Sequence, residues 1–270
     1  MSPRDVDRKI VDLVACAREE HGIHEGCDGE TACRKLGLEL GRAPLPPGTA
    51  GMLSGNRVLV AQKVRWTPRS EFTIYHEITH HLIEEDGEII EYYTGLLRSD
   101  DKAFKREVER CCDRGAAEFL MPRKRVAETI RTETFSVNLV GIIAERHGAS
   151  LIASALQLAH CAPVECYVVL CSHGSVPRSR PRRRSLYVDY AGASPTRKYP
   201  LARFSPVPGD HVLVHAWKDQ GFAEGASNVP FRSGRYMPCH CEAKPLGPFV
   251  AGILSFGNAA APPGQMAFDM

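Results

Sequence analysis

The spacing of apolar residues changes along this chain, from helical periods in its first part to strand-like patterns in its last part. Apolar positions recur at helical spacing in 1–20 and every three or four residues in 72–82, which predicts two amphipathic helices, and a further helix is predicted from about Lys102 to Leu120, where Met121 and Pro122 end it. The Pro/Gly-rich segment GRAPLPPGTAG (41–51) predicts a loop, and NRVLVAQ (56–62) after it predicts a short strand. The first part is therefore expected to be mostly helical.

The second half of the chain is expected to differ in architecture. NLVGIIAERHG and SLIASALQLAH meet at Gly148 and predict a helix-turn-helix-like hairpin. Beyond residue 163, four segments predict strands of a separate sheet: ECYVVLCS, SLYVDYAG, HVLVHAW and FVAGILSFG. We therefore predict three domains, at 1–124, 125–162 and 163–270, with a frayed tail after the last strand.

Composition limits the classes of function. A chain of 270 residues with 43% hydrophobic content can bury a large core or two to three small ones. Its 34 Lys+Arg against 32 Asp+Glu leave a net charge of +2, which predicts no global attraction to nucleic acid. No run approaches the roughly 20 apolar residues of a membrane span, and charges interrupt residues 1–20 too often for a signal peptide. We therefore expect a cytoplasmic protein whose ten cysteines are reduced.

The segment EFTIYHEITHHLIEEDGE (71–88) carries the clearest chemical signal. His76 and His80 are four residues apart, so on a helix both imidazoles project from one face and can share a tetrahedral metal ion. Glu77 is displaced by about 100° around the helix axis, where it can serve as a base without being a ligand. This pattern is typical of a hydrolytic metal site.

A third ligand is expected from KREVERCCDRGAAEFLMP, which offers Glu107, Glu109 and Glu118. Glu109 has Asp113 four residues later on the same face, where a carboxylate could accept the free N–H of a metal-bound histidine. The small residues 115–117 would let the two helices approach closely. This pairing favours Glu109 among the three candidates as the ligand beside His76 and His80, with Asp113 behind them and Glu77 as the candidate base.

The chain resembles the ImmA/IrrE metallopeptidases in EFTIYHEITHHL and ERCCDRGAAEFLMP, which are similar to the family's H-E-x-x-H helix and its E-x-x-A-N/D helix ending in L-M-P. Glu109 fills the family's ligand position, whereas Cys112 stands where alanine is usual. GNRVLVAQKVRWTPRSEFT is similar to the strand before the metal helix, and VPFRSGRYMP to a segment of the IrrE branch's C-terminal domain. The segment DGEIIEYYTGLLRSDDKAF is read as an intervening loop that differs from relatives.

The resemblance implies an α+β molecule in three parts: a thermolysin-like (gluzincin-type), mostly helical peptidase domain, a helix-turn-helix-like helical linker and a C-terminal GAF-like α/β sheet domain. It also implies a site-specific endopeptidase that cleaves a DdrO-like XRE-type transcriptional repressor and so induces the DNA-damage response to radiation and desiccation. A small-molecule or signal ligand of the GAF-like domain is a further expectation from fold analogy.

The predicted metal is Zn²⁺, with Mn²⁺ as an alternative, since two imidazoles and a carboxylate suit several divalent ions. The ion would lower the pKa of its water and polarise the scissile carbonyl, and Glu77 would act as general base. Tyr92, Tyr93, His81 and several arginines remain candidates for stabilising the oxyanion. His81 is predicted not to be a ligand, because it points about 100° away from His80.

Weaker signals leave alternatives open. The arginines of PRSRPRRRS, Arg178 to Arg184, favour a solvated loop over a nucleic-acid contact, and the helix hairpin favours a structural or docking role over DNA binding. Cys239 and Cys241 could share one side of a strand as part of a soft-metal or redox site. Cys112 is predicted to be a core residue, although a thiolate near the metal could make activity redox-sensitive. The alternative function is a non-proteolytic, DNA-binding transcriptional regulator with a structural or sensory metal.

Overall fold

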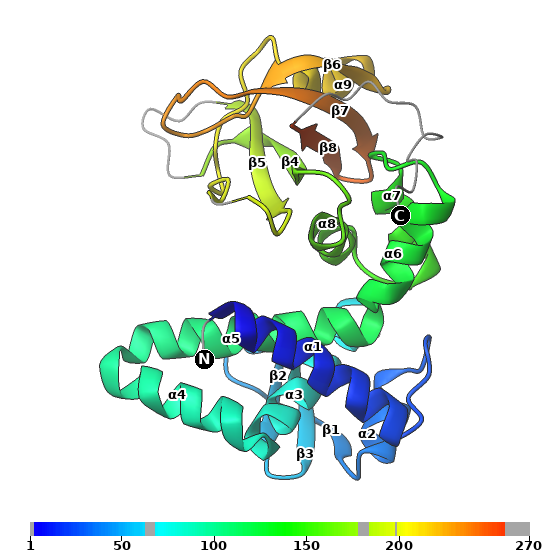
Figure 1. Cartoon of the computed structure of the whole chain (residues 1–270), viewed down its shortest axis with the longest axis vertical. Helices are drawn as coiled ribbons and strands as arrows, with labels where there is room; N and C mark the ends of the chain where they lie inside the picture. Colours follow the sequence, from blue (N-terminus) through cyan, green and yellow to red (C-terminus); the bar gives the residue numbers. More distant parts are fainter. Residues whose placement is uncertain (1–2, 63–67, 178–183, 198, 257–270) are drawn as a thin grey trace, which may run out of the picture. The chain divides into compact units, whose positions relative to one another are not determined.

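The structure is a computed structural model that describes residues 3–62, 68–177, 184–197 and 199–256 (Figure 1). The chain forms two compact units, Met1–Pro122 with His147–Ser150 and Arg123–Arg146 with Leu151–Met270. Both contain helices and a sheet, so the α+β class is confirmed. The division into three domains stays a prediction. The predicted tail and Arg178 to Arg183 lie outside the described residues, and Arg184 is exposed at the start of a strand.

The N-terminal unit packs helices around a small sheet. The helices predicted at 1–20, 72–82 and 102–120 are present as α1, α3 and α5, and the strand predicted at 56–62 is present as β3. The sheet has the order β1-β3-β2, with β1 parallel and β2 antiparallel to β3, so β2 lies at an edge. The elements of this unit are α1 Pro3–Glu20, α2 Gly29–Lys35, β1 Glu39–Ala43, β2 Gly51–Ser54, β3 Arg57–Ala61, α3 Pro68–Glu85, α4 Gly87–Ser99 and α5 Asp101–Leu120.

The prediction of a loop between the two site-bearing helices was wrong, because α4 occupies most of it. The Asp86 carboxylate accepts hydrogen bonds from the backbone N–H groups of Glu88 and Ile89, which caps the start of α4. Asp100 ends α4 and caps α5 in the same way. The predicted loop at 41–51 is also shorter than expected, since its first residues belong to β1 and its last begins β2.

Helices α3 and α5 pack closely at one point. A Cβ atom added to Gly115 of α5 would lie 2.3 Å from the Thr79 Cγ2 atom of α3. One helical turn away, the rings of Tyr75 on α3 and Phe119 on α5 stack with centroids 4.9 Å apart. The expectation that small residues in α5 allow a close approach is therefore confirmed at Gly115.

The C-terminal unit contains a five-stranded antiparallel sheet in the order β5-β4-β8-β7-β6. Its elements are α6 Arg123–Thr132, α7 Leu139–Arg146, α8 Leu151–His160, β4 Cys166–Ser175, β5 Arg184–Ala193, α9 Val212–Asp219, β6 Ala223–Asn228, β7 Pro238–Leu246 and β8 Phe249–Ser255. The predicted hairpin is present as α7 and α8, which are bent by 114° around a turn that contains Gly148 at a φ of 58°.

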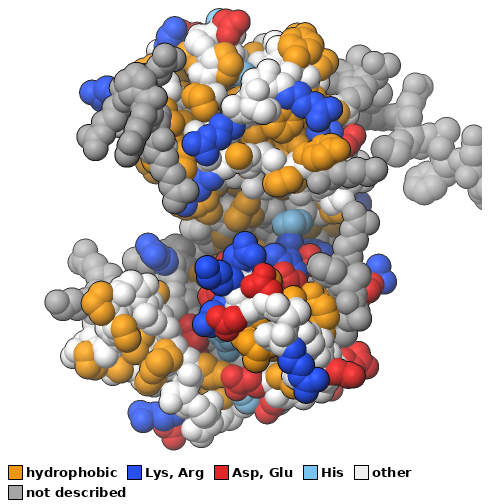
Figure 2. Space-filling view, turned by 90° about the vertical axis from the view of Figure 1, so that its left-hand side faces the viewer, with side chains coloured by type: hydrophobic (Ala, Val, Ile, Leu, Met, Phe, Trp, Pro, Cys, Tyr) orange, Lys and Arg blue, Asp and Glu red, His pale blue; other side chains and the backbone are white. Residues whose placement is uncertain are grey.

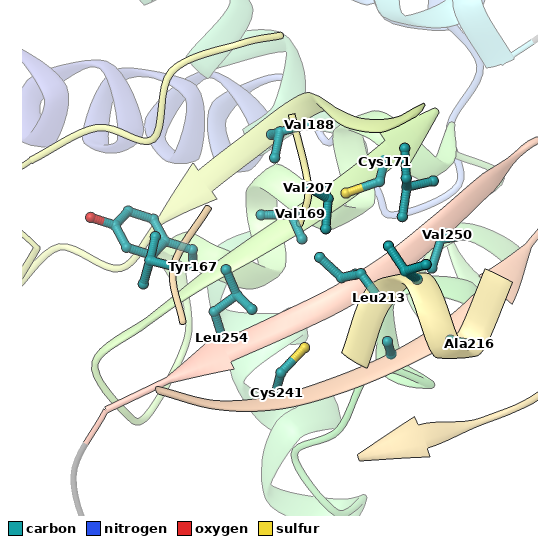
Figure 3. Packing of buried hydrophobic residues seen from close by; sticks show 14 of the residues in the cluster. Tyr167, Val169, Cys171, Val188, Val207, Leu213, Ala216, Cys241, Val250 and Leu254 are labelled. Atoms are coloured by element: carbon teal, nitrogen blue, oxygen red, sulfur yellow. The ribbon is translucent and has the colours of Figure 1, made fainter. Parts of the chain in front are cut away.

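Each face of this sheet carries a helix. On one face, Leu213 of α9 packs so tightly over β8 that a Cβ atom at Gly252 would lie 2.6 Å from its Cδ2 atom. On the other face, Ala159 of α8 lies 2.7 Å from a Cβ atom built at Gly192 of β5. Figure 3 shows the hydrophobic cluster on the α9 face, in which Cys171 and Cys241 lie among valine and leucine side chains.

The prediction of a strand at HVLVHAW was wrong, because this segment is α9. A short apolar run does not distinguish a strand from a buried helix. The His211 Nδ1 atom accepts a hydrogen bond from the Leu213 backbone N–H and caps the helix, which ends at Gln220 in the left-handed conformation. Strand β6 was not predicted, and β7 was anticipated only around Cys239 and Cys241, which were expected to share one side of a strand.

No single helix among the described residues is long and apolar enough to cross a membrane. Helices α7 and α8 meet that criterion only when they are taken together, across their 114° bend.

Candidate metal centre

Helix α3 places His76 and His80 on one face, with ring centroids 5.1 Å apart. The helix can hold these polar residues at the surface of the core because its opposite face buries Ile74, Tyr75 and Ile78 completely or nearly so. The two imidazoles remain partly accessible, with 14% and 22% of their side chains exposed. Both can therefore meet an ion that enters from solvent.

Helix α5 brings acidic side chains to these two rings. Glu109 carboxylate oxygens lie 3.4 Å from His76 Nε2 and 3.8 Å from His80 Nε2. An Asp113 oxygen lies 3.0 Å from His76 Nδ1. With the Nδ1 proton donated to Asp113, His76 keeps Nε2 free to bind a metal.

These distances fit a divalent ion held by two imidazoles and one carboxylate. Neighbouring nitrogen and oxygen ligands of a tetrahedral centre are separated by about 3.4 Å, which is close to the two observed Glu109 distances. The structure thus brings together His76, His80, Glu109 and Asp113, which the sequence motifs and the family resemblance selected. Their assignment as ligands stays a prediction.

Cys112 is also close to this group. The ligating atoms of His76, His80 and Cys112 all lie within 4.8 Å of one another. Geometry alone therefore offers both Glu109 and Cys112 as the third ligand. We favour Glu109 for an open catalytic site because its carboxylate reaches both rings and lines a cleft, whereas the Cys112 side chain is fully buried and burial raises the pKa of its thiol.

The electrostatics of the group favour a basic Glu77. The Glu77 residue is only 6% exposed, and this burial raises the pKa of its carboxyl, although the His76 ring and a hydrogen bond from the Leu53 backbone act in the opposite direction. Burial lowers the pKa of His76, but the hydrogen bond to Asp113 and the charges of Asp113, Glu77 and Glu109 together outweigh it, so the net shift is upward. Burial and the neighbouring His76 lower the pKa of His80, which favours its neutral, ligating form.

A cleft of about 670 Å³ runs over the site. Residues 48–53, which include most of β2, form one side, and α3 and α5 form the other. The remaining lining residues are Arg69, Phe72, Thr73, His76, Glu77, His80, Glu84, Glu109 and Asp113. Sequence reasoning missed the contribution of β2, although the turn SGN between GML and VLV is a hairpin signal.

Strand β2 lies very close to the helix that carries Glu77. A Cβ atom at Gly51 would lie 2.5 Å from Thr73 Cγ2 and 2.7 Å from Glu77 Oε1. Only glycine fits at this position without movement of the neighbouring side chains. The edge of the sheet thereby reaches the candidate base.

The other candidates from the sequence lie elsewhere. Glu107 forms an ion pair with Arg110, and His81 lies 3.5 Å from Glu85. Tyr93 is buried in the core cluster against which Tyr92 packs. Neither tyrosine, His81, Glu107 nor Glu118 lines the described cleft, and Arg69 is its only lysine or arginine among the described residues.

The CHC segment does not form part of a metal-binding group among the described residues. Cys239 and Cys241 point into the hydrophobic cluster of the C-terminal unit, where burial raises the pKa of the Cys239 thiol to about 12 and also raises that of Cys241. The two thiols therefore behave as small core side chains.

On the face of the N-terminal unit that Figure 2 shows, lysine and arginine side chains lie among aspartate and glutamate side chains. This matches the near balance of charge in the sequence.

Comparison with known proteins identifies a family of metallopeptidases. Residues 33–158 match the model of the IrrE N-terminal-like domain, Peptidase_M78. The chain belongs to the ImmA/IrrE metallopeptidase family, as its motifs predicted.

Two relatives extend the similarity over most of the chain, and both are named radiation response metalloprotease IrrE. The protein from Deinococcus radiodurans is 26% identical over 252 residues, which cover 90% of this chain and 74% of the relative. The protein from Deinococcus deserti is 30% identical over 190 residues, which cover 70% of this chain and 66% of the relative.

A solved structure shares the fold. A transcriptional regulator from Mycobacterium tuberculosis matches with a TM-score of 0.55 and 16% identity, over 93% of this chain and 87% of that one. At this identity the match describes the fold alone.

Proposed function

We propose that this protein is a site-specific, metal-dependent endopeptidase that cleaves a DdrO-like XRE-type transcriptional repressor and thereby induces a response to radiation and desiccation damage. The family and the names of the two relatives support a metalloprotease. The observation that carries the proposal is a buried carboxylate, Glu77, beside three side chains that can hold an ion, in a cleft with space for a substrate.

Zn²⁺ or Mn²⁺ would be held by His76, His80 and Glu109, with Asp113 fixing the His76 ring. A bound ion supplies Lewis acidity toward the scissile carbonyl. Glu77 takes a proton from the attacking water and delivers it to the leaving amine, for which burial prepares it by raising its pKa.

A peptide substrate would lie along β2. Among the described residues, this strand pairs only with β3 within its sheet, and apart from the Leu53 backbone, which hydrogen-bonds to Glu77, its outer edge could pair with the main chain of an extended peptide. The lining residues of α3, from Arg69 to Glu84, span about 22 Å along the helix axis. That length accommodates roughly six or seven residues of an extended chain.

The remaining parts of the proposal concern architecture. The N-terminal unit is proposed to be a thermolysin-like, gluzincin-type peptidase domain, and the sheet of the C-terminal unit a GAF-like domain that receives a signal ligand. The antiparallel five-stranded sheet with a helix on each face supports the second assignment.

Incubation with a purified XRE-type repressor tests this function, with Zn²⁺ or Mn²⁺, with chelator, and with the Glu77→Gln variant. We expect a single metal-dependent cut, located by mass spectrometry. The chelator should abolish it, and Glu77→Gln should slow it by about 10²–10⁴-fold while it retains the metal. An intact repressor in every arm, with metal bound, would contradict the proposal and favour the non-proteolytic regulator.

A further inference from the structure

The side chain of Cys112 has a position that the proposed mechanism does not use. It is fully buried on α5, one helical turn after Glu109. No hydrogen bond to its thiol is present among the described residues, and its sulfur belongs to the same 4.8 Å group as the ligating atoms of His76 and His80. A buried thiol facing two imidazoles is the donor set of many zinc sites.

We propose that Cys112 is a fourth protein ligand of this metal centre, so that a thiophilic ion such as Zn²⁺ is enclosed by His76, His80, Glu109 and Cys112 when no substrate is present. This inference rests on the metal centre of the proposed function and goes beyond it, because it assigns a resting state that differs from the open, catalytic one.

The geometry requires only a small movement. In a tetrahedral zinc site with ordinary bond lengths, a sulfur and a nitrogen ligand are separated by about 3.6 Å. The ligating atoms of His76, His80 and Cys112 lie within 4.8 Å of one another, so a contraction of about 1 Å brings these three donors to ligand spacing, with the Glu109 carboxylate beside both histidines. Rotation of one cysteine side chain about χ1 supplies a shift of this size.

The spacing of α5 explains how one helix offers two ligands. Glu109 and Cys112 are three residues apart, so both project toward α3. Cys111, its equally buried neighbour, projects about 100° away, and its sulfur receives a hydrogen bond from Arg110 at 3.6 Å. Only one of the two adjacent cysteines therefore belongs to the centre.

In this ligand exchange, the Cys112 thiol would lose its proton as its sulfur takes the fourth position on the ion, and the water that held that position would leave, with both the proton and the water passing to solvent. The reverse exchange reopens that position for substrate. A closed site with four protein ligands is typical of structural rather than catalytic zinc, so the Zn²⁺ form should be latent.

Cys112 should also determine which ions the centre encloses with four protein ligands. Mn²⁺ prefers oxygen and nitrogen donors, whereas Zn²⁺ and Co²⁺ bind thiolate well. We therefore expect Cys112 to ligate Zn²⁺ and Co²⁺ but to leave Mn²⁺ with an open position. The peptidase should be more active with Mn²⁺ than with Zn²⁺, and Cys112→Ala should reduce this difference.

Absorption spectroscopy of the Co²⁺-loaded full chain tests the inference without any substrate. The wild-type protein should show visible d–d bands and a near-ultraviolet thiolate-to-cobalt charge-transfer band. Cys112→Ala should lose the charge-transfer band and keep the d–d bands. Cys111→Ala is the matched control and should keep both. Cys112→Ser gives a second variant of similar size, which should also lose the charge-transfer band.

Each contrary result has a separate meaning. The same charge-transfer band in wild type and Cys112→Ala would assign it to another cysteine and overturn the inference. Visible d–d bands without a charge-transfer band in the wild type would overturn Cys112 as a ligand and leave the proposed peptidase intact. The absence of d–d bands from the wild type would overturn the metal centre and, with it, both proposals.

Discussion

The two units of this protein both bury cysteines, but they surround them differently. In the N-terminal unit, Cys112 lies beside two histidine rings. In the C-terminal unit, Cys171 and Cys241 lie among valine, leucine and alanine side chains, and no metal-binding group is found among the described residues there. Burial alone therefore does not indicate the role of a thiol, whereas the polar atoms within reach of its sulfur do.

Metal content provides the strongest test of this contrast. His76→Ala and His80→Ala should each abolish stoichiometric metal binding, because each removes one of the few donors in the group. Cys239→Ala and Cys241→Ala should leave it unchanged, since those thiols have only core neighbours. Elemental analysis after dialysis measures the result. Loss of metal from either cysteine variant would contradict the contrast.

The helix contact that assembles the N-terminal site can be broken at Gly115. Gly115→Ala places a methyl group against Thr79 and should reduce the free energy of unfolding by about 1–3 kcal/mol, because neither helix backbone can move freely. Metal affinity should fall as well, since α5 carries Glu109. Denaturant unfolding of the metal-free protein and metal titration measure the two effects.

Gly95 of α4 is the matched control for this change, because nothing lies within 4 Å of a Cβ atom at that position. Gly95→Ala should stabilise the protein by up to roughly 1 kcal/mol through helix propensity. Equal effects of the two substitutions would show that the close approach at Gly115 is not required.

Asp113 allows the role of a single metal-site ring, that of His76, to be tested. Asp113→Asn keeps the size of the side chain but removes the charge that fixes His76 Nδ1. Metal affinity should fall by about 10–100-fold while the fold persists. Asp101→Asn, on the exposed first turn of the same helix, should leave the affinity unchanged. Competition with a chromophoric chelator measures both constants.

The stability of the C-terminal unit should depend on pH through His211, and metal binding should not change this dependence. Burial lowers the pKa of His211 from its ordinary value of 6.5, although its hydrogen bond to the Asn228 backbone opposes this. The unfolded chain therefore binds the proton more readily. The contribution of neutral His211 to stability is complete above about pH 6.5 and declines as the pH falls toward the lower, folded pKa.

His211→Asn should reduce this dependence, because asparagine can still cap α9 but does not titrate in this range. Thermal unfolding at roughly pH 7.5 and roughly pH 5.5 measures the change. His24→Asn, at an exposed position of the N-terminal unit, is the control, because His24 is not among the groups that shift the His211 pKa. An unchanged pH dependence in His211→Asn would assign the effect to other groups.

Local patterns in the sequence were informative where one helix or one strand decided the answer. The helical period of residues 72–82 correctly predicted α3, and Met121 and Pro122 correctly marked the end of α5. Local patterns failed for HVLVHAW, where a His211 cap and a surface of β7 and β8 to pack against produced a helix from an apolar run that also suits a strand. They failed again at α4, where the two aspartate caps were not recognised.

For the candidate site, the helical repeat of the sequence was enough to predict which residues share one face of each helix. His76 with His80, and Glu109 with Asp113, follow from the helical repeat alone. Tertiary structure decided everything that depends on a distance between elements: the edge of β2 beside Glu77, and Cys112, rather than Cys239 or Cys241, beside the histidines. The physical reason is that periodicity fixes the direction of a side chain on its own element, whereas only the packing of α3 on α5 fixes which atoms it meets.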